Sequence, residues 1–128
     1  SLGAVVNLLK VSGESIPAAA DSFDSIVCTW TLCTIPNVYR ALDEMRRVLK
    51  RDGALIFIEH GMSPEVGVAR VQRGLEPLWK PVGGGCHLAR RPDALLTAAG
   101  FSLDTLEQGY QPGPRFAAYM YHGVARRR

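Results

Sequence analysis

Two short apolar segments on either side of an amphipathic one constrain the fold of this chain more than any other feature. Residues 25–29 (SIVCT) and 54–58 (ALIFI) are nearly unbroken apolar runs, without the polar alternation of a half-exposed strand. Strands that are covered on both faces of a parallel sheet have this pattern. The sequence therefore predicts two neighbouring, parallel, central strands of an α/β sheet.

The segment between these runs has the pattern of a surface helix. Its apolar residues recur at spacings of three and four, with charged residues on the other positions; they are Val38, Ala41, Leu42, Met45, Val48 and Leu49. A single apolar stripe of this kind packs a helix against a sheet. Pro36 and Asn37 stand where the helix starts, and Asp52 with Gly53 is expected to end it.

Residues that could bind a ligand or take part in catalysis lie at the end of each predicted strand. Cys28 to Cys33 spans the end of the first strand, and Glu59 with His60 ends the second. Open α/β sheets bind their ligands at the carboxyl ends of the strands, so both groups are expected to line one cleft. His60 is the candidate here that titrates near neutrality.

After Gly61 the pattern is weaker. Residues 64–79 mix apolar and charged residues, which indicates one or two short helices broken near Gly74 and Pro77. Residues 92–99, followed by a glycine, predict a short helix, and residues 101–106 and 116–124 predict two strands joined through a turn.

Length and composition indicate one domain over residues 1–128. The chain is 47% hydrophobic, which suffices for one core, and it has no repetitive segment. Its apolar runs are far shorter than a membrane span. Three cysteines within strands and glycine turns argue for reduced thiols. We expect a cytoplasmic chain without a membrane span.

Two other classes of function are weighed and set aside. The net charge is +3, with arginines at 126–128, but no groove-reading motif accompanies them, so a solvated tail is favoured over nucleic-acid binding. Cysteine and histidine suit zinc. Cys28 and Cys33 are nevertheless five residues apart and form no C-x-x-C pair, so no metal site is expected.

Four motifs occur in an order that resembles a known family. They are Cys28-Thr29 with Leu32-Cys33, Arg47-Val48-Leu49 with Gly53, the strand end Glu59-His60, and residues 85–90 (GCHLAR). In this order they resemble the second half of a class I S-adenosylmethionine-dependent methyltransferase of the ubiquinone and menaquinone biosynthesis type. The resemblance is stronger still to the small alkyl-thiol methyltransferase group, and it spans nearly the whole chain.

The resemblance implies a Rossmann-like three-layer α/β sandwich with a mostly parallel sheet and a C-terminal antiparallel strand. The expected strand order is 25–29, 54–58, 116–124, 101–106. Relatives carry two earlier strands with a glycine-rich loop, which are missing here, so a truncated domain is expected. Loss of those strands would leave residues 4–11 to pair with 25–29, or two chains to form a homodimer through the exposed edge.

The resemblance also implies roles for individual residues. Ser12, Gly13 and Glu14, together with Cys28, Thr29 and Trp30, would bind the cofactor S-adenosylmethionine, weakly or not at all in this truncated chain. Cys33 and Trp79 would contact a small-molecule methyl acceptor. Glu59 and His60 would be the catalytic residues that orient the acceptor or remove its proton.

Several alternatives stay open from the sequence. Glu59 could accept hydrogen bonds from loop amides, His60 could lie at the core edge, and Trp30 could serve packing alone. The acceptor is a thiol or a quinone precursor. A non-catalytic remnant that dimerises or binds a partner is the alternative to an enzyme.

Overall fold

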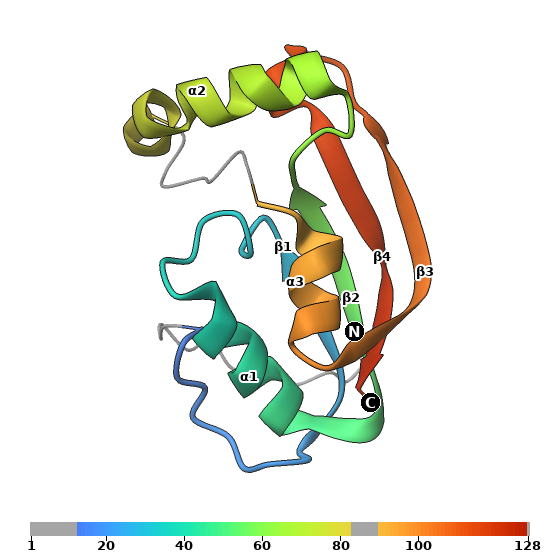
Figure 1. Ribbon diagram of the computed structural model, residues 1–128. Coiled ribbons are helices and arrows are strands. Elements are labelled where there is room, and N and C mark those ends of the chain that lie inside the picture. The colour runs from blue at the N-terminus through green and yellow to red at the C-terminus, as the bar shows by residue number, and fades with distance from the viewer. Residues whose placement is uncertain (1–12, 83–89, 128) are drawn as a thin grey trace, which may run out of the picture.

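The computed structural model describes residues 13–82 and 90–127, with only the backbone for 79–82. These residues form a four-stranded mixed sheet with helices (Figure 1). In chain order the elements are β1 (Phe23–Thr29), α1 (Val38–Val48), β2 (Leu49–His60), α2 (Val66–Val82), α3 (Pro92–Ala98), β3 (Phe101–Tyr110), the 3-10 helix η1 (Arg115–Ala117) and β4 (Tyr119–Arg127).

The sheet has the order β1-β2-β4-β3, with β1 parallel to β2 and β4 antiparallel to both of its neighbours. The predicted α/β class, the parallel pair and the strand order are thereby confirmed. The predicted helix at 92–99 is confirmed as α3. The expected pairing of residues 4–11 lies outside the described residues, as do Ser12 and Cys86.

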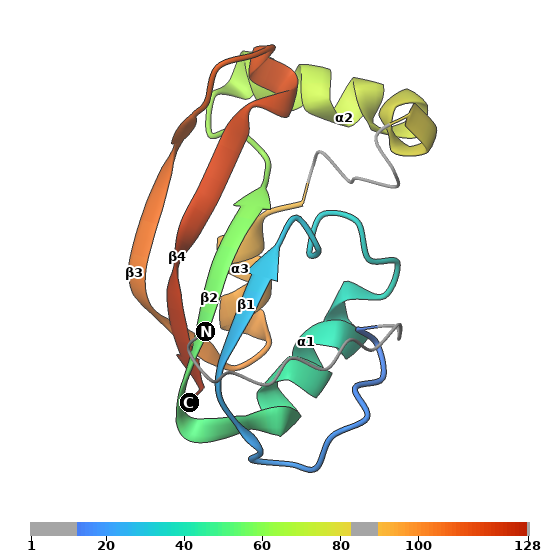
Figure 2. The same cartoon turned by 180° about the vertical axis from the view of Figure 1, so that it is seen from behind.

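Helices α1 and α3 pack on one face of the sheet, and α2 lies beyond the carboxyl ends of β1 and β2 (Figures 1 and 2). The core between sheet and helices includes Leu55 and Phe57 from β2 and Leu96 from α3, all without exposed surface. On the other face Val27 is 67% exposed and Ile58 40% exposed. The prediction that both strands are covered on both faces is therefore wrong for the described residues, because α1 and α3 share one face and no described helix covers the other (Figures 1 and 2).

The junction between α1 and β2 also differs from the prediction. Asn37 caps the start as expected, with its side chain accepting the Arg40 N–H at 3.2 Å. The helix ends at Val48, four residues before the predicted stop, and Leu49 is already extended with φ −80° and ψ 133°. Leu49 is completely buried. Burying a leucine side chain stabilises the fold by about 1.5–3 kcal/mol, which exceeds the small preference for a glycine stop.

Gly53 has a packing role in this junction. Phe23 pairs with Leu49 and Ser25 with Ala54, so the residues between Leu49 and Ala54 bulge out of the ladder. A Cβ on Gly53 would lie 2.6 Å from Leu49 Cδ1. Glycine is therefore needed there for close approach to Leu49, not for ending the helix.

Helix α2 is continuous through Gly74 and Pro77, where a break was predicted. Gly74 faces open space, so its lack of a side chain disturbs no packing. The helix is held by Gln72, which is 1% exposed and bonds to Ser63 and Gly61 on one side and to Phe116 on the other. Figure 1 shows the last turns of α2 at an angle to the first ones, as expected of a helix that contains proline.

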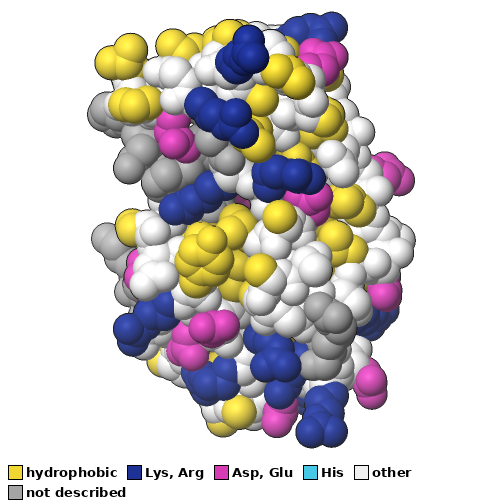
Figure 3. All heavy atoms as spheres, viewed as in Figure 1, with side chains coloured by type: hydrophobic (Ala, Val, Ile, Leu, Met, Phe, Trp, Pro, Cys, Tyr) yellow, Lys and Arg dark blue, Asp and Glu magenta, His cyan; other side chains and the backbone are white. Residues whose placement is uncertain are grey.

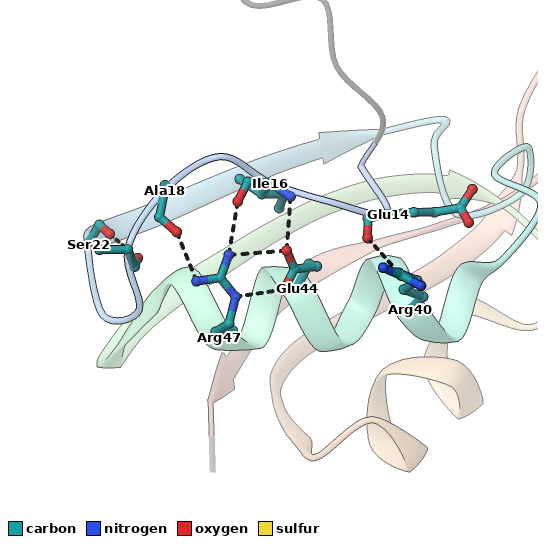
Figure 4. A network of polar contacts seen from close by, with 8 residues as sticks. Glu14, Ile16, Ala18, Ser22, Arg40, Glu44 and Arg47 are labelled. Atoms are coloured by element: carbon teal, nitrogen blue, oxygen red, sulfur yellow. Dashed lines mark hydrogen bonds and ion pairs between the residues drawn. The ribbon is translucent and has the colours of Figure 1, made fainter.

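The segment ahead of β1 is fixed along α1 by a polar network (Figure 4). Arg47 donates to the carbonyl oxygens of Ala18 at 2.8 Å and Ile16 at 2.9 Å, and it pairs with Glu44 at 2.6 Å. Glu44 in turn accepts the Ile16 N–H at 3.0 Å. These bonds satisfy backbone groups that belong to neither helix nor sheet.

Candidate functional site

The carboxyl ends of β1 and β2 meet at one edge of the sheet, as the sequence predicted. Thr29 lies opposite Ile58 in the ladder, and the Trp30 N–H donates to the Ile58 carbonyl at 2.9 Å. Glu59 and His60 follow directly, on opposite faces because side chains alternate along a strand. Glu59 is buried on the helix side, and His60 is half-buried on the other side.

Glu59 is completely buried and binds the loop that follows β1. Its Oε1 accepts the backbone N–H groups of Thr31 at 3.0 Å and Leu32 at 3.1 Å, and the Cys28 thiol donates to it at 3.3 Å. Burial raises the pKa of Glu59, and the loop amides oppose this shift. With no exposed surface, Glu59 has no path to an acceptor molecule in this structure. The geometry gives it the role of loop anchor.

Cys28 completes this buried group. Its pKa is raised by burial and by the neighbouring Glu59 carboxylate. A thiol in such surroundings stays protonated and donates a hydrogen bond to the carboxylate, so it is not a nucleophile.

Trp30 has a backbone conformation that is rare for a bulky residue, with φ of 46°. The residue is 54% exposed, and the centroid of its ring lies 6.1 Å from that of His60 at an interplanar angle of 36°. Residues held in strained conformations cluster at functional sites. The structure thus brings two of the predicted site residues together at the strand ends.

A hollow of about 320 Å³ adjoins this pair on the face that α1 and α3 leave open. Its lining consists of Trp30, Ile58, Gln111, Met120 and His122. Met120 lies opposite His60 in the ladder, and His122 lies opposite Ile58. The sequence analysis did not single out Met120 or His122. Their period-2 spacing in the last strand was the signal that places them on one face.

His60 is suited to accept a proton. Burial lowers its pKa, and the backbone of Ala117 acts weakly in the opposite direction. The imidazole is therefore neutral at pH 7, which is the form that takes up a proton.

The other predicted site residues are spread around the loop that follows β1. Gly13 lies against it, since a Cβ there would be 3.1 Å from Ile35 Cδ1. The carbonyl oxygen of Glu14 accepts a hydrogen bond from Arg40 Nε at 3.0 Å (Figure 4). Gly13 therefore lies beside Ile35, in the loop that leads away from the rim, the sheet edge at which Thr29 and Trp30 lie.

Cys33 is 1% exposed and packs against Leu75 of α2 and Phe116 of η1. It therefore connects the loop after β1 to α2, and it has almost no surface that a bound acceptor could contact. The side chain of Trp79, the second residue expected at the acceptor, is not described.

Among the residues that the structure describes, no group of three His, Cys, Asp or Glu side chains is placed to hold a metal ion. None of the described helices combines the length and the apolar character needed to cross a membrane.

The sequence of this chain is similar to those of known methyltransferases. Residues 2–57 match the profile of a family described as a methyltransferase domain. Thiol S-methyltransferase TMT1B of Rattus norvegicus is 43% identical over 104 residues, which are 80% of this chain and 42% of that protein. The C-methyltransferase UbiE of Rhizobium meliloti, named for ubiquinone and menaquinone biosynthesis, is 36% identical over 54 residues, covering 42% of this chain and 21% of that protein.

Solved structures show the same fold. A Thermotoga maritima S-adenosylmethionine-dependent methyltransferase, described as a possible histamine N-methyltransferase, superimposes with a TM-score of 0.68 at 20% identity. The match covers 96% of this chain and 65% of that one. The resemblance to class I S-adenosylmethionine-dependent methyltransferases is confirmed. The chain spans 42% of the length of the thiol methyltransferases it matches.

The residues present in this methyltransferase-like chain fit part of an S-adenosylmethionine site. The cofactor is a sulfonium cation, and exposed aromatic faces attract cations. Trp30 provides such a face at the strand ends. The adjoining hollow is lined by no Lys or Arg among the described residues, so no described cation there would repel the sulfonium.

Proposed function

We propose that this chain is part of an S-adenosylmethionine-dependent methyltransferase that methylates a small thiol. The observation that carries the proposal is the strained, exposed Trp30 beside the half-buried His60 at the carboxyl ends of β1 and β2. The thiol acceptor is supported by relatives named thiol S-methyltransferases at 38–43% identity.

The proposed cofactor site lies on the β1 side of this rim. When bound, S-adenosylmethionine supplies a methyl group on a positively charged sulfur. Thr29 and Trp30 would hold one side of it, and Gly13 with Glu14 the other, across the loop after β1. Because methyl transfer needs alignment and exclusion of water, these residues act mainly by positioning.

His60 is proposed as the group that takes the proton of the acceptor thiol. The thiolate is the nucleophilic form of sulfur, and only a small fraction of a thiol is ionised near neutrality without a base. A neutral imidazole nitrogen at the rim can accept this proton. Glu59 would act at a distance, by holding the loop that carries Trp30.

The test is transfer of a labelled methyl group from S-adenosylmethionine to a small aliphatic thiol, run with the chain and with the longer protein that contains it. His60→Gln is expected to lower kcat with little change in cofactor affinity measured by titration calorimetry. Glu107→Gln is the control, since Glu107 is a titratable residue of β3 that is not among the described residues lining the hollow. Unchanged kcat in His60→Gln, or transfer to a quinone-precursor phenol but not to the thiol, would contradict the proposal.

A second candidate is a non-catalytic module that dimerises through its sheet. The exposure of Val27, Ile56 and Ile58 on the face opposite the helices favours it. Apolar patches of this kind mark surfaces that are covered in the working protein. A stable dimer in light scattering, together with no heat on addition of S-adenosylmethionine to chain or longer protein, would support the module over the enzyme.

A further inference from the structure

The loop of residues 30–36, which follows β1, is held through both its N–H groups and its carbonyl groups. Its N–H groups at Thr31 and Leu32 donate to the Glu59 carboxylate. Its carbonyl groups accept from one guanidinium: Arg90 Nη1 reaches Leu32 O at 2.8 Å and Ile35 O at 2.6 Å. Arg90 Nη2 adds a third bond, to Pro36 O at 3.2 Å.

This arrangement explains how Trp30 keeps its strained backbone. Strained residues persist only where their surroundings over-determine them. Trp30 is itself tied by its N–H to Ile58 O and by its carbonyl oxygen to the Thr34 hydroxyl at 3.3 Å. The loop residues after Trp30 are then fixed by hydrogen bonds from their N–H groups to Glu59 and from Arg90 to their carbonyl oxygens. No described bond reaches the Trp30 ring from a donor or acceptor, so its position depends on the loop.

We infer that Arg90 is a positioning residue, which with Glu59 holds the ring of Trp30 at the rim beside His60. Arg90 ends the sequence motif at residues 85–90, to which no role has so far been attached. The planar guanidinium suits the task because it donates to several carbonyl oxygens at once, whereas an ammonium group is a point donor. The consequence for methyl transfer rests on the proposed function; the effect on Trp30 does not.

The test uses Trp30 as its own reporter. The chain has two tryptophans, so Trp79→Phe leaves Trp30 as the single tryptophan, which can be excited at wavelengths that the tyrosines do not absorb. In that background Arg90→Gln is expected to lower the fluorescence anisotropy and the near-ultraviolet circular dichroism of Trp30. Amide exchange at Thr31 and Leu32 should become at least about tenfold faster, while the amides paired between β2 and β4 keep their rates.

Arg91→Gln is the matched control. Arg91 is the next residue, and its guanidinium pairs with Asp93 at 3.0 Å instead of with the loop. It is expected to leave the Trp30 signal and the exchange at Thr31 and Leu32 unchanged. Should Arg90→Gln fail to fold, Arg90→Lys carries the test, with an intermediate loss of Trp30 anisotropy because one or two of the three carbonyl bonds are lost.

Two results separate this inference from the proposed function. Wild-type anisotropy and exchange rates in both Arg90 variants would overturn the inference, whatever the activity. Loss of the Trp30 signal without any S-adenosylmethionine binding by chain or longer protein would uphold the inference and count against the methyltransferase proposal. If both hold, Arg90→Gln lowers kcat and raises KM in the longer protein, and Arg90→Lys restores part of each.

Discussion

The two faces of the sheet show how differently one strand can be used. On the face covered by α1 and α3, Leu55 and Phe57 have no exposed surface. On the opposite face their neighbours Ile56 and Ile58 are 38% and 40% exposed. The residues are equally apolar, so hydrophobicity alone does not tell which of them form the core of this chain.

The difference teaches where function should be sought. The covered face holds the buried anchor Glu59, and the open face holds Trp30, His60 and the hollow beside them. Exposed apolar side chains also occur on α2, at Val66, Val71 and Leu78. Figure 3 shows hydrophobic side chains near Lys or Arg side chains along the upper edge of the molecule. Apolar surface that a chain leaves exposed is available to ligands or partners.

The largest expected effect is a difference in the free energy of unfolding between substitutions on the two faces of the sheet. Leu55→Ala should lower the free energy of unfolding by about 2–5 kcal/mol, because it opens a cavity in the core. Ile56→Ala, one residue along, should cost about 1 kcal/mol or less, because much of the side chain already meets solvent. Urea unfolding of the two variants measures both. Equal losses would mean that the open face is covered in solution.

Glu59 should make the protein less stable as pH rises. Its folded pKa is raised above the ordinary 4.5 by burial, so the folded state holds this proton longer than the unfolded state. The stability that Glu59 contributes is complete below pH 4.5 and declines above it until the raised folded pKa is passed. Glu59→Gln removes this titration, so the unfolding free energy of the wild type minus that of the variant should decline as pH rises through this range. A difference that does not change with pH would contradict the assignment.

The contribution of His60, on the open face, to stability should depend on pH in the opposite direction to that of Glu59. Its folded pKa is lowered from 6.5, so the unfolded state takes up a proton first as pH falls. The stability it contributes is complete above pH 6.5 and declines below that value until the folded pKa is passed. Proton NMR of His60 should give a titration midpoint below 6.5. A midpoint above 6.5 would contradict the half-buried placement.

The smallest effect is expected at Val27. Its side chain is 67% exposed on β1, and threonine keeps the β-branched shape that strands favour. Val27→Thr should change the free energy of unfolding by no more than about 0.5 kcal/mol. If light scattering shows a dimer, the same variant should weaken it. A larger loss of stability in a monomer would place Val27 in a covered surface.

The strand-helix-strand unit and its strand ends could be predicted because they depend on local order. The spacing of Val38, Ala41 and Met45 defines a helix stripe whatever it packs on. Element ends were less predictable. Leu49 leaves α1 for the core because tertiary packing outweighs local preference, and α2 continues through Pro77. The role of Arg90 could not be predicted at all, since its carbonyl partners lie 55 and 58 residues away along the chain.

The sequence by itself determined that Thr29 and Glu59 reach one edge of a sheet, because chain direction and residue period suffice for that. Only the tertiary structure decided that Glu59 turns inward to the loop amides while His60 turns outward to Trp30. The physical reason is that a strand presents its residues to two faces alternately. Which face becomes core depends on where the helices pack, and no short segment carries that information.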